Sequence, residues 1–207
     1  MIKDGTRVSA TDKPDDNPSS RRVVLIGGIT ALFAGIFSRT VGAATNAKKS
    51  ATTPTVVSVE IFSAVGKSEK IVSIPKVIKT DEQWSKQLSV QSFKVARRSG
   101  TERAFSGEYA KSHGDGLYRC ICCANALFDS KTKYESGTGW PSFWQAISSL
   151  NVIKSSDRSF GMQRDEISCG LCDAHLGHVF DDGPKPTGLR YCMNSVSLNF
   201  VPRGSIN

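Results

Sequence analysis

The spacing of the cysteines constrains this chain more than any other feature. Cys120 and Cys123 form one C-x-x-C pair, Cys169 and Cys172 form a second, and a lone Cys192 follows both. Two such pairs that meet in space make a tetrahedral thiolate cage for Zn²⁺, a closed structural site with no position open to a substrate. The sequence therefore predicts a structural zinc site on the paired cysteines and leaves Cys192 as a candidate nucleophile.

The distribution of charge argues against a nucleic-acid-binding protein. The chain of 207 residues has a net charge of +8, but residues 80–207 contain fifteen basic and thirteen acidic side chains. A surface that binds phosphates needs clustered basic residues. Because the part with all the cysteines and histidines is nearly balanced, we expect no nucleic-acid partner.

Most of the excess basic residues lie at the front of the chain, which has the pattern of an export signal. Arg21 and Arg22 precede an apolar run over 23–37, and small residues follow up to Ala47. Paired arginines, a glycine-containing apolar segment and an A-x-A-like site predict a twin-arginine signal peptide over 1–47, so that the mature protein is exported to the periplasm. Export of a folded chain would let zinc shield its thiolates from oxidation.

The alternative for this segment is an uncleaved membrane anchor. The apolar run of about 15 residues is shorter than the roughly 20 that span a bilayer. We therefore favour cleavage, after Ala43 or Ala47, and expect no stable association with the membrane afterwards.

Residues 48–79 are predicted to be a linker with a short hairpin, since Val57, Val59 and Ile61 alternate with polar residues before a second apolar run. A domain over 80–207 then begins with a capping box, Thr80 to Gln83, and two short helices, the second over 90–98. From Tyr118 onward, short apolar runs cut by Gly, Pro and Asp predict strands and turns. Residues 181–188 should be a loop, and residues 189–201 one long strand.

The predicted last strand contains the candidate nucleophile. Side chains two residues apart share a face, so Arg190, Cys192 and Asn194 are expected to point together. A guanidinium beside a thiol lowers the pKa of that thiol, and an amide can orient a substrate oxygen or a histidine. The alternative is an inert cysteine buried in a strand.

Two of the three histidines, His175 and His178, lie just after the second cysteine pair. A zinc site would hold them rigidly, and an imidazole can donate a proton to a developing oxyanion. They are alternatively metal ligands together with Cys169 and Cys172, although zinc fingers usually separate the Cys and His pairs further. His113, in a polar loop, is expected to be a surface residue.

Several segments together closely resemble methionine-R-sulfoxide reductases of the B type. They are GTERAFSGEY from Gly100, YRCICC from Tyr118, LFDSKTKYESGTGWPSFW from Leu127 and CGLCDAHLGHVFDDGPKPTGLRYCMNS from Cys169. The resemblance covers about residues 80–201 and implies a mainly β fold, in which two antiparallel sheets pack as a tent with short N-terminal helices and zinc on the four paired cysteines.

The resemblance also implies the reaction and its residues. Cys192 attacks the sulfur of the R-sulfoxide and becomes a sulfenic acid, while His178 supplies the proton, with His175 and Asn194 shaping the site. Around the substrate it places Trp140, Phe180, Asp182 and Arg190. This reaction repairs oxidised proteins as part of an oxidative stress response.

One position departs from the family pattern. Many relatives have a resolving cysteine where this chain has Thr138, so the usual disulfide cannot form. Either an external thiol resolves Cys192, which we favour, or Cys122, the surplus thiol between the paired cysteines, takes that role. The expected partners are methionine-R-sulfoxide in oxidised proteins and a thioredoxin-like, glutaredoxin-like or small-thiol reductant.

Two other classes of function remain as alternatives. A zinc-ribbon interaction module would leave Cys192 inert, and a dithiol oxidoreductase would cycle the C-x-x-C pairs, which metal binding forbids. A metal-loaded protein with two free thiols fits only the zinc interpretations.

Overall fold

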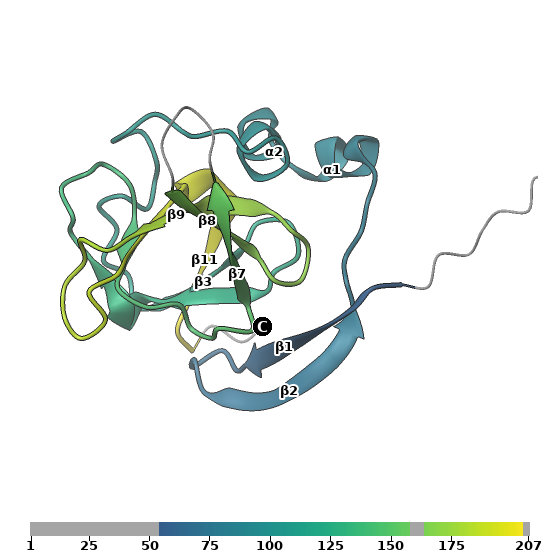
Figure 1. Ribbon diagram of the computed structural model, residues 1–207, viewed down its shortest axis with the longest axis horizontal. Helices are drawn as coiled ribbons and strands as arrows, with labels where there is room; N and C mark the ends of the chain where they lie inside the picture. The colour runs from purple at the N-terminus through teal and green to yellow at the C-terminus, as the bar shows by residue number, and fades with distance from the viewer. Residues whose placement is uncertain (1–53, 158–163, 205–207) are drawn as a thin grey trace, which may run out of the picture. The chain divides into compact units, whose positions relative to one another are not determined.

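A computed structural model describes residues 54–157 and 164–204, and the fold over these ranges is mainly β. Figure 1 shows strands wrapped around a common interior, with the two helices along one edge. The elements in chain order are β1 (Val56–Phe62), β2 (Ser68–Pro75), α1 (Asp81–Gln87), α2 (Val90–Ala96), β3 (Gly116–Cys120), β4 (Ala126–Asp129), η1 (Ser130–Thr132), β5 (Lys133–Tyr134), β6 (Ser142–Phe143), β7 (Val152–Asp157), β8 (Arg164–Cys169), β9 (His175–Phe180), β10 (Arg190–Met193), η3 (Ser195–Ser197) and β11 (Leu198–Pro202).

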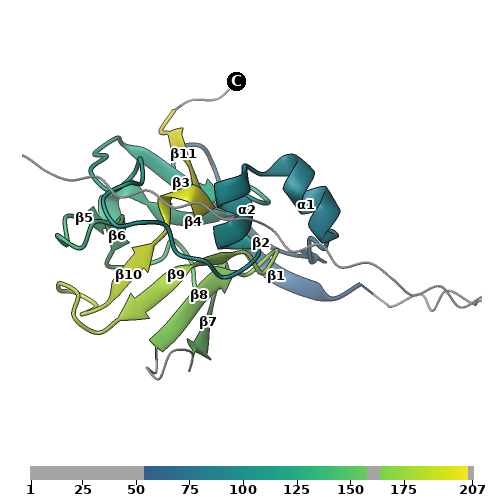
Figure 2. The ribbon, with the colours of Figure 1, turned by 90° about the horizontal axis from the view of Figure 1, so that it is seen from above.

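Antiparallel pairing builds one sheet of six strands in the order β5-β6-β10-β9-β8-β7 and one of three strands in the order β11-β3-β4. In Figure 2, β10, β9, β8 and β7 lie side by side. The prediction of two antiparallel sheets is therefore confirmed, and the predicted loop over 181–188 connects β9 to β10.

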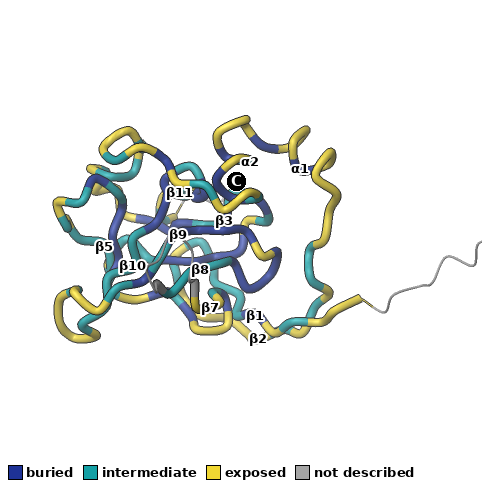
Figure 3. Tube along the Cα trace, turned by 45° about the horizontal axis from the view of Figure 1, so that its top comes forward, coloured by how far each residue is buried: buried dark blue, intermediate teal, exposed yellow. Residues whose placement is uncertain are grey.

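Aromatic side chains join the two sheets. Phe143 of the six-stranded sheet stacks on Phe128 of the three-stranded sheet with ring centroids 4.4 Å apart, and meets Tyr118 edge-on at 5.0 Å. All three side chains are fully buried. In Figure 3 the buried segments run through the middle of the fold, and the exposed segments lie toward its periphery. These rings fill the space between the sheets and fix the position of β6 next to β10.

Helix α1 begins with the predicted capping box. The Thr80 hydroxyl accepts a hydrogen bond from the Gln83 backbone N–H, and the Gln83 side chain accepts one from the Thr80 N–H. Trp84 is fully buried. Helix α2 ends at Ala96, two residues earlier than predicted, and the Arg97 guanidinium donates to the carbonyl oxygen of Cys172 at 2.8 Å.

The hairpin of β1 and β2 is attached to the six-stranded sheet through the buried side chain of Asn151. Its amide accepts from the Glu60 N–H at 2.8 Å and donates to the carbonyl oxygens of Glu60 and Ala126. A second attachment is the ion pair of Lys76 with Asp173 at 2.6 Å. The hairpin and the residue that follows it are thus attached to Asn151 and to Asp173, the residue directly after the second cysteine pair.

The prediction of one long strand over 189–201 is wrong. Strand β10 ends at Met193, the turn η3 follows, and β11 joins the other sheet. The cause is the buried Glu102, whose carboxylate accepts hydrogen bonds from the N–H groups of Ser195 at 2.7 Å and Val196 at 3.0 Å. Apolar alternation in the sequence cannot reveal this contact, because Glu102 is distant in the chain.

The predicted signal peptide, residues 1–47, and most of the predicted linker up to residue 53 lie outside the described residues. Within the described ranges, neither helix is long and apolar enough to cross a bilayer.

Candidate active site and metal centre

The four paired cysteines meet as predicted. Their sulfur atoms all lie within 4.8 Å of one another, with Cys120 3.7 Å from Cys172 and Cys123 3.6 Å from Cys169. Zinc–thiolate bonds of about 2.3 Å in a tetrahedron separate the sulfurs by roughly 3.8 Å, so this cluster fits a structural zinc ion.

Hydrogen bonds hold the cysteine cluster from outside. The Asn125 side chain donates to the Cys169 sulfur at 3.6 Å and to the Asn151 carbonyl oxygen, which also accepts the Gly170 N–H. Such contacts orient metal ligands and stabilise their thiolates. His175 and His178 are outside the cluster, and Cys122 is a buried thiol beside it.

The lone cysteine lies in the middle of the six-stranded sheet. Strand pairing places Tyr134, Ser142, Cys192, His178 and Glu166 in one row across five neighbouring strands. Residues directly opposite one another in adjacent strands have side chains on the same face. The fold therefore brings Cys192 next to His178, although they belong to different segments of the chain.

A cavity of about 120 Å³ opens beside these two residues. Its walls come from four separate segments, and the residues that line it are Thr101, Trp140, Gly177, His178, Phe180, Cys192 and Asn194. Five of the eight predicted site residues other than the metal ligands thus line one small hollow, three of them polar or reactive groups and two of them aromatic rings. An apolar hollow with a few convergent polar groups is the usual form of a ligand site.

Arg190 and Asp182 lie next to this cavity and bind each other. Two guanidinium nitrogens of Arg190 donate to the two carboxylate oxygens of Asp182, both at 2.8 Å, and the guanidinium lies 4.3 Å from the centre of the Phe180 ring. The carboxylate raises the pKa of Arg190, and the guanidinium lowers that of Asp182. This pair fixes the ring of Phe180 at the cavity.

Arg190 lowers the pKa of Cys192, as expected, but it does not decide the overall direction of the shift. Burial of the thiol raises its pKa above the ordinary value, and this effect exceeds the opposite effects of the Thr138 hydroxyl and Arg190. Desolvation disfavours the thiolate, and the guanidinium charge is already shared with Asp182.

A β-bulge brings the two histidines together. Ile167 pairs with Gly177 and Ser168 with His175, so Leu176 is an extra residue in β9. The rings of His175 and His178 consequently meet edge-on with centroids 5.4 Å apart. His175 is buried, and its Nδ1 lies 2.6 Å from a carboxylate oxygen of Glu166.

The Asn194 side chain lines the cavity and binds two backbone groups beside it. This residue follows β10, and its side-chain oxygen accepts the Glu102 N–H at 2.9 Å while its amide group donates to the Leu176 carbonyl oxygen at 3.1 Å. These bonds fix β9 and the Glu102 segment around the cavity.

Glu102 is a positioning residue that the sequence analysis did not single out. Besides binding the turn after Asn194, it accepts a hydrogen bond from the Trp140 indole at its own carbonyl oxygen, 3.2 Å away. A buried carboxylate is uncommon unless its oxygens are satisfied. The only available signal was the motif GTERAFSGEY, in which Glu102 is one of two glutamates.

Thr138 lies beside the nucleophile as part of a chain of hydroxyl groups. Its oxygen is 3.9 Å from the Cys192 sulfur and 2.8 Å from the Ser136 hydroxyl, which in turn is 2.7 Å from Ser142. Thr138 therefore lies at the Cys192 sulfur, in the position where the family resemblance implies a resolving cysteine in many relatives. Cys122 is buried and lies beside Cys120 and Cys172 of the cluster.

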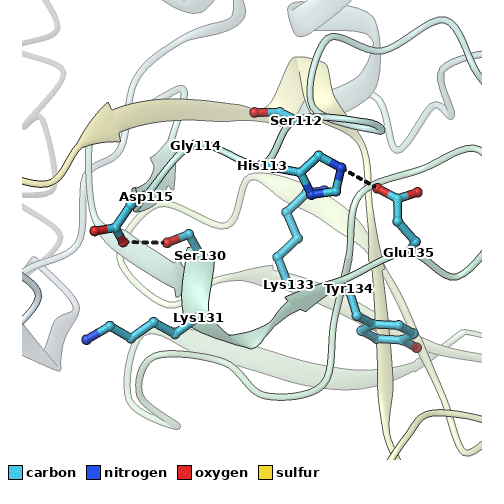
Figure 4. A pocket seen from close by; sticks show the side chains of 9 residues that line it. All are labelled: Ser112, His113, Gly114, Asp115, Ser130, Lys131, Lys133, Tyr134 and Glu135. Carbon is cyan, nitrogen blue, oxygen red and sulfur yellow. Dashed lines mark hydrogen bonds and ion pairs between the residues drawn. The ribbon is translucent and has the colours of Figure 1, made fainter.

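His113 belongs to a different hollow. Figure 4 shows it pointing toward Glu135, with 3.6 Å between the ring nitrogen and a carboxylate oxygen, while Ser130 donates to Asp115. The His113 side chain is 75% exposed, as expected for a surface residue.

Comparison with known proteins agrees with this fold and site. The fold and the site define a SelR domain, whose family model matches residues 88–202. The similar proteins include "Peptide methionine sulfoxide reductase MsrB" of Pseudomonas aeruginosa strain UCBPP-PA14, 55% identical over 130 residues that make up 63% of this chain and 98% of that protein. The protein of the same name from Pseudomonas syringae pv. syringae strain B728a is 56% identical over 128 residues, or 62% of this chain and 98% of its own length. The chain belongs to the MsrB family of peptide methionine sulfoxide reductases.

Proposed function

We propose that this chain reduces methionine-R-sulfoxide in oxidised proteins, with Cys192 as the nucleophile. Reduction of methionine sulfoxide follows from membership of the MsrB family. The observation that carries the residue assignment is the cavity in which Cys192, His178 and Asn194 lie beside Trp140 and Phe180. Its aromatic wall suits an S-methyl group, and its polar side offers a proton to an oxygen.

The reaction begins when the Cys192 thiolate attacks the sulfur of the sulfoxide. This attack forms a bond between the two sulfur atoms, while His178 protonates the sulfoxide oxygen. The hydroxyl group then moves to the Cys192 sulfur, and the bond between the two sulfur atoms breaks with its electron pair left on the methionine sulfur. The products are methionine and a sulfenic acid on Cys192. His175, oriented by Glu166, supports the His178 ring.

The reductant completes the cycle. Two equivalents of an external thiol convert the sulfenic acid back to the Cys192 thiol, releasing water and a disulfide. We propose a thioredoxin-like, glutaredoxin-like or small-thiol reductant, because Thr138 lies at the nucleophile and Cys122 is buried beside the cysteine cluster.

The cavity favours methionine sulfoxide within a polypeptide over the free amino acid. None of the described residues that line it has a permanent charge, and the neighbouring Arg190 and Asp182 bind each other. The α-ammonium and α-carboxylate groups of a free amino acid would find no charged partner here, whereas peptide groups need none. This supports a role in the repair of oxidised proteins.

We also propose zinc on Cys120, Cys123, Cys169 and Cys172, supported by the distances between their sulfur atoms. When bound, the metal supplies a cross-link between the two cysteine pairs and takes no part in the reaction. It thereby stabilises the segment that leads directly into β9 and the histidines.

The proposed mechanism is tested by mass spectrometry of the reduced protein after one equivalent of R-sulfoxide without reductant. We expect one added oxygen on Cys192, captured by dimedone, because the hydroxyl group of Thr138 lies at the Cys192 sulfur, the usual place of a resolving thiol. A disulfide between Cys122 and Cys192 would instead assign the resolving role to Cys122. Unmodified Cys192 alongside newly formed methionine would refute the mechanism.

We propose that residues 1–47 direct export to the periplasm, followed by cleavage. Replacing Arg21 and Arg22 by Lys should block translocation almost completely if the twin-arginine route is used, since an ordinary secretory signal tolerates this change. Fractionation of cells with the wild-type chain as control measures this. A soluble protein that keeps Met1 as its N-terminus would show that the segment is no cleaved signal.

A further inference from the structure

Phe105 is an exposed aromatic residue beside the cavity. Its side chain is 66% exposed, and it is the only aromatic residue among the large hydrophobic side chains exposed within residues 54–157 and 164–204. It lies in the segment that also contains Thr101 and Glu102. An exposed phenylalanine contributes no core packing, so its place in the fold needs another explanation.

The backbone holds Phe105 in a conformation that a phenylalanine seldom adopts. Its φ is +64°, in the left-handed region that is unfavourable for bulky residues, and its N–H donates to the Gly139 carbonyl oxygen at 2.8 Å. Strained residues of this kind cluster at binding and catalytic sites. The contacts of the Glu102 segment maintain this conformation.

The ring of Phe105 lies against the loop that forms one wall of the site. A Cβ atom added to Gly139 would come within 2.9 Å of two carbons of the ring, so the ring covers the backbone of this glycine. Gly139 joins Thr138, at the Cys192 sulfur, to Trp140, which lines the cavity. The exposed ring therefore continues the aromatic wall of the cavity outward to the surface.

The size of the cavity determines which part of the substrate contacts the ring of Phe105. Pockets that enclose whole small molecules usually measure about 300–1,000 Å³, whereas this cavity measures about 120 Å³. It accepts a methionine sulfoxide side chain and leaves the neighbouring residues of the substrate outside. Those residues must lie along the rim, where Phe105 offers an apolar face.

We propose that Phe105 selects the sequence around the oxidised methionine by binding an apolar side chain next to it in the substrate. The inference rests on the proposed function, because it concerns residues that flank the same sulfoxide. Segments with an aromatic or aliphatic neighbour should be reduced in preference to those with polar neighbours, since contact with the ring removes apolar surface from water.

The test compares three substrates: an unstructured peptide with Leu beside methionine-R-sulfoxide, the same peptide with Ser in that place, and N-acetyl-methionine-R-sulfoxide. For the wild-type protein we expect kcat/KM to be about fivefold higher with Leu than with Ser. Phe105→Ala should abolish this difference mainly through KM, and should change kcat/KM for the N-acetyl compound by less than about twofold. The control variant is Val90→Ala, which removes an exposed apolar side chain from a different element, α2. It should keep the preference for Leu over Ser.

A second variant separates the contact from backbone effects. Phe105→Gly also removes the ring but relieves the positive φ, so it should be at least as stable as Phe105→Ala and equally lacking in preference. A wild-type protein without preference, or a preference that persists in Phe105→Ala, would overturn this inference while leaving the proposed function intact. If the wild-type protein reduced none of the three substrates, the proposed function itself would be overturned.

Discussion

Cys192→Ser should lower methionine sulfoxide reductase activity by at least about 1,000-fold. In the proposed mechanism the sulfur atom of Cys192 takes up the oxygen, and a serine hydroxyl can neither ionise near neutral pH nor be oxidised in this way. Steady-state rates with saturating substrate and dithiothreitol measure the effect. Zinc content and melting temperature should stay close to those of the wild-type protein, because the Cys192 sulfur lies outside the cysteine cluster.

Cys122→Ser provides the comparison for this first prediction. This variant also replaces a sulfur atom by oxygen, at the other cysteine that is not a proposed zinc ligand. With an external thiol as reductant, turnover should continue. Retained activity in Cys192→Ser would refute the assignment of the nucleophile and favour a protein in which this cysteine is an inert strand residue.

Cys169→Ser should remove the metal and lower the free energy of unfolding by at least about 4 kcal/mol. Cys169 is fully buried between the sheets, and its sulfur lies 3.6 Å from that of Cys123. With zinc held as we propose, loss of one ligand opens the cross-link between the two cysteine pairs, and metal-binding energy in such a site is folding energy. Metal analysis and thermal unfolding followed by circular dichroism measure both effects.

Cys192→Ser is the matched control for the zinc prediction, because it changes the same atom in the same chain away from the cluster. The two variants should behave in opposite ways. Cys192→Ser should lose turnover and keep zinc, whereas Cys169→Ser should lose zinc and stability. A Cys169→Ser protein with stoichiometric zinc and an unchanged melting temperature would contradict the structural role of the metal.

Short-range patterns were sufficient to predict much of this structure. The spacing within each cysteine pair predicted the cluster, Thr80 and Gln83 predicted the start of α1, and apolar alternation predicted the hairpin. The start of α1 and the hairpin depend on residues that are close in the chain, whereas the cluster joins two such cysteine pairs whose contacting members are 46 and 52 residues apart. The resemblance of the long motifs to a known family predicted the class of fold and the reaction.

Contacts between distant residues account for what the sequence did not reveal. The break between β10 and β11 depends on Glu102, 93 residues before Ser195 in the chain. The same contact explains why Asn194 binds backbone groups of two other segments. The raised pKa of Cys192 depends on how deeply the assembled sheets bury the thiol, which the neighbouring Arg190 does not indicate.

The arrangement around the cavity predicts a choice between the two epimers of the sulfoxide. With the methyl group against Trp140, the sulfur toward Cys192 and the oxygen toward His178, every substituent of the chiral sulfur has a defined place. The other epimer exchanges the methyl group and the oxygen, which puts a polar atom on the aromatic ring and withholds it from the proton donor.

The most direct measurement supplies the purified protein with dithiothreitol and the separated R and S epimers of one unstructured peptide, and follows methionine formation by chromatography. Our account predicts that the R epimer is reduced to completion while the S epimer remains, and that Cys192→Ser reduces neither. Reduction of the S epimer at a comparable rate, or of neither epimer by the metal-loaded wild-type protein, would contradict it.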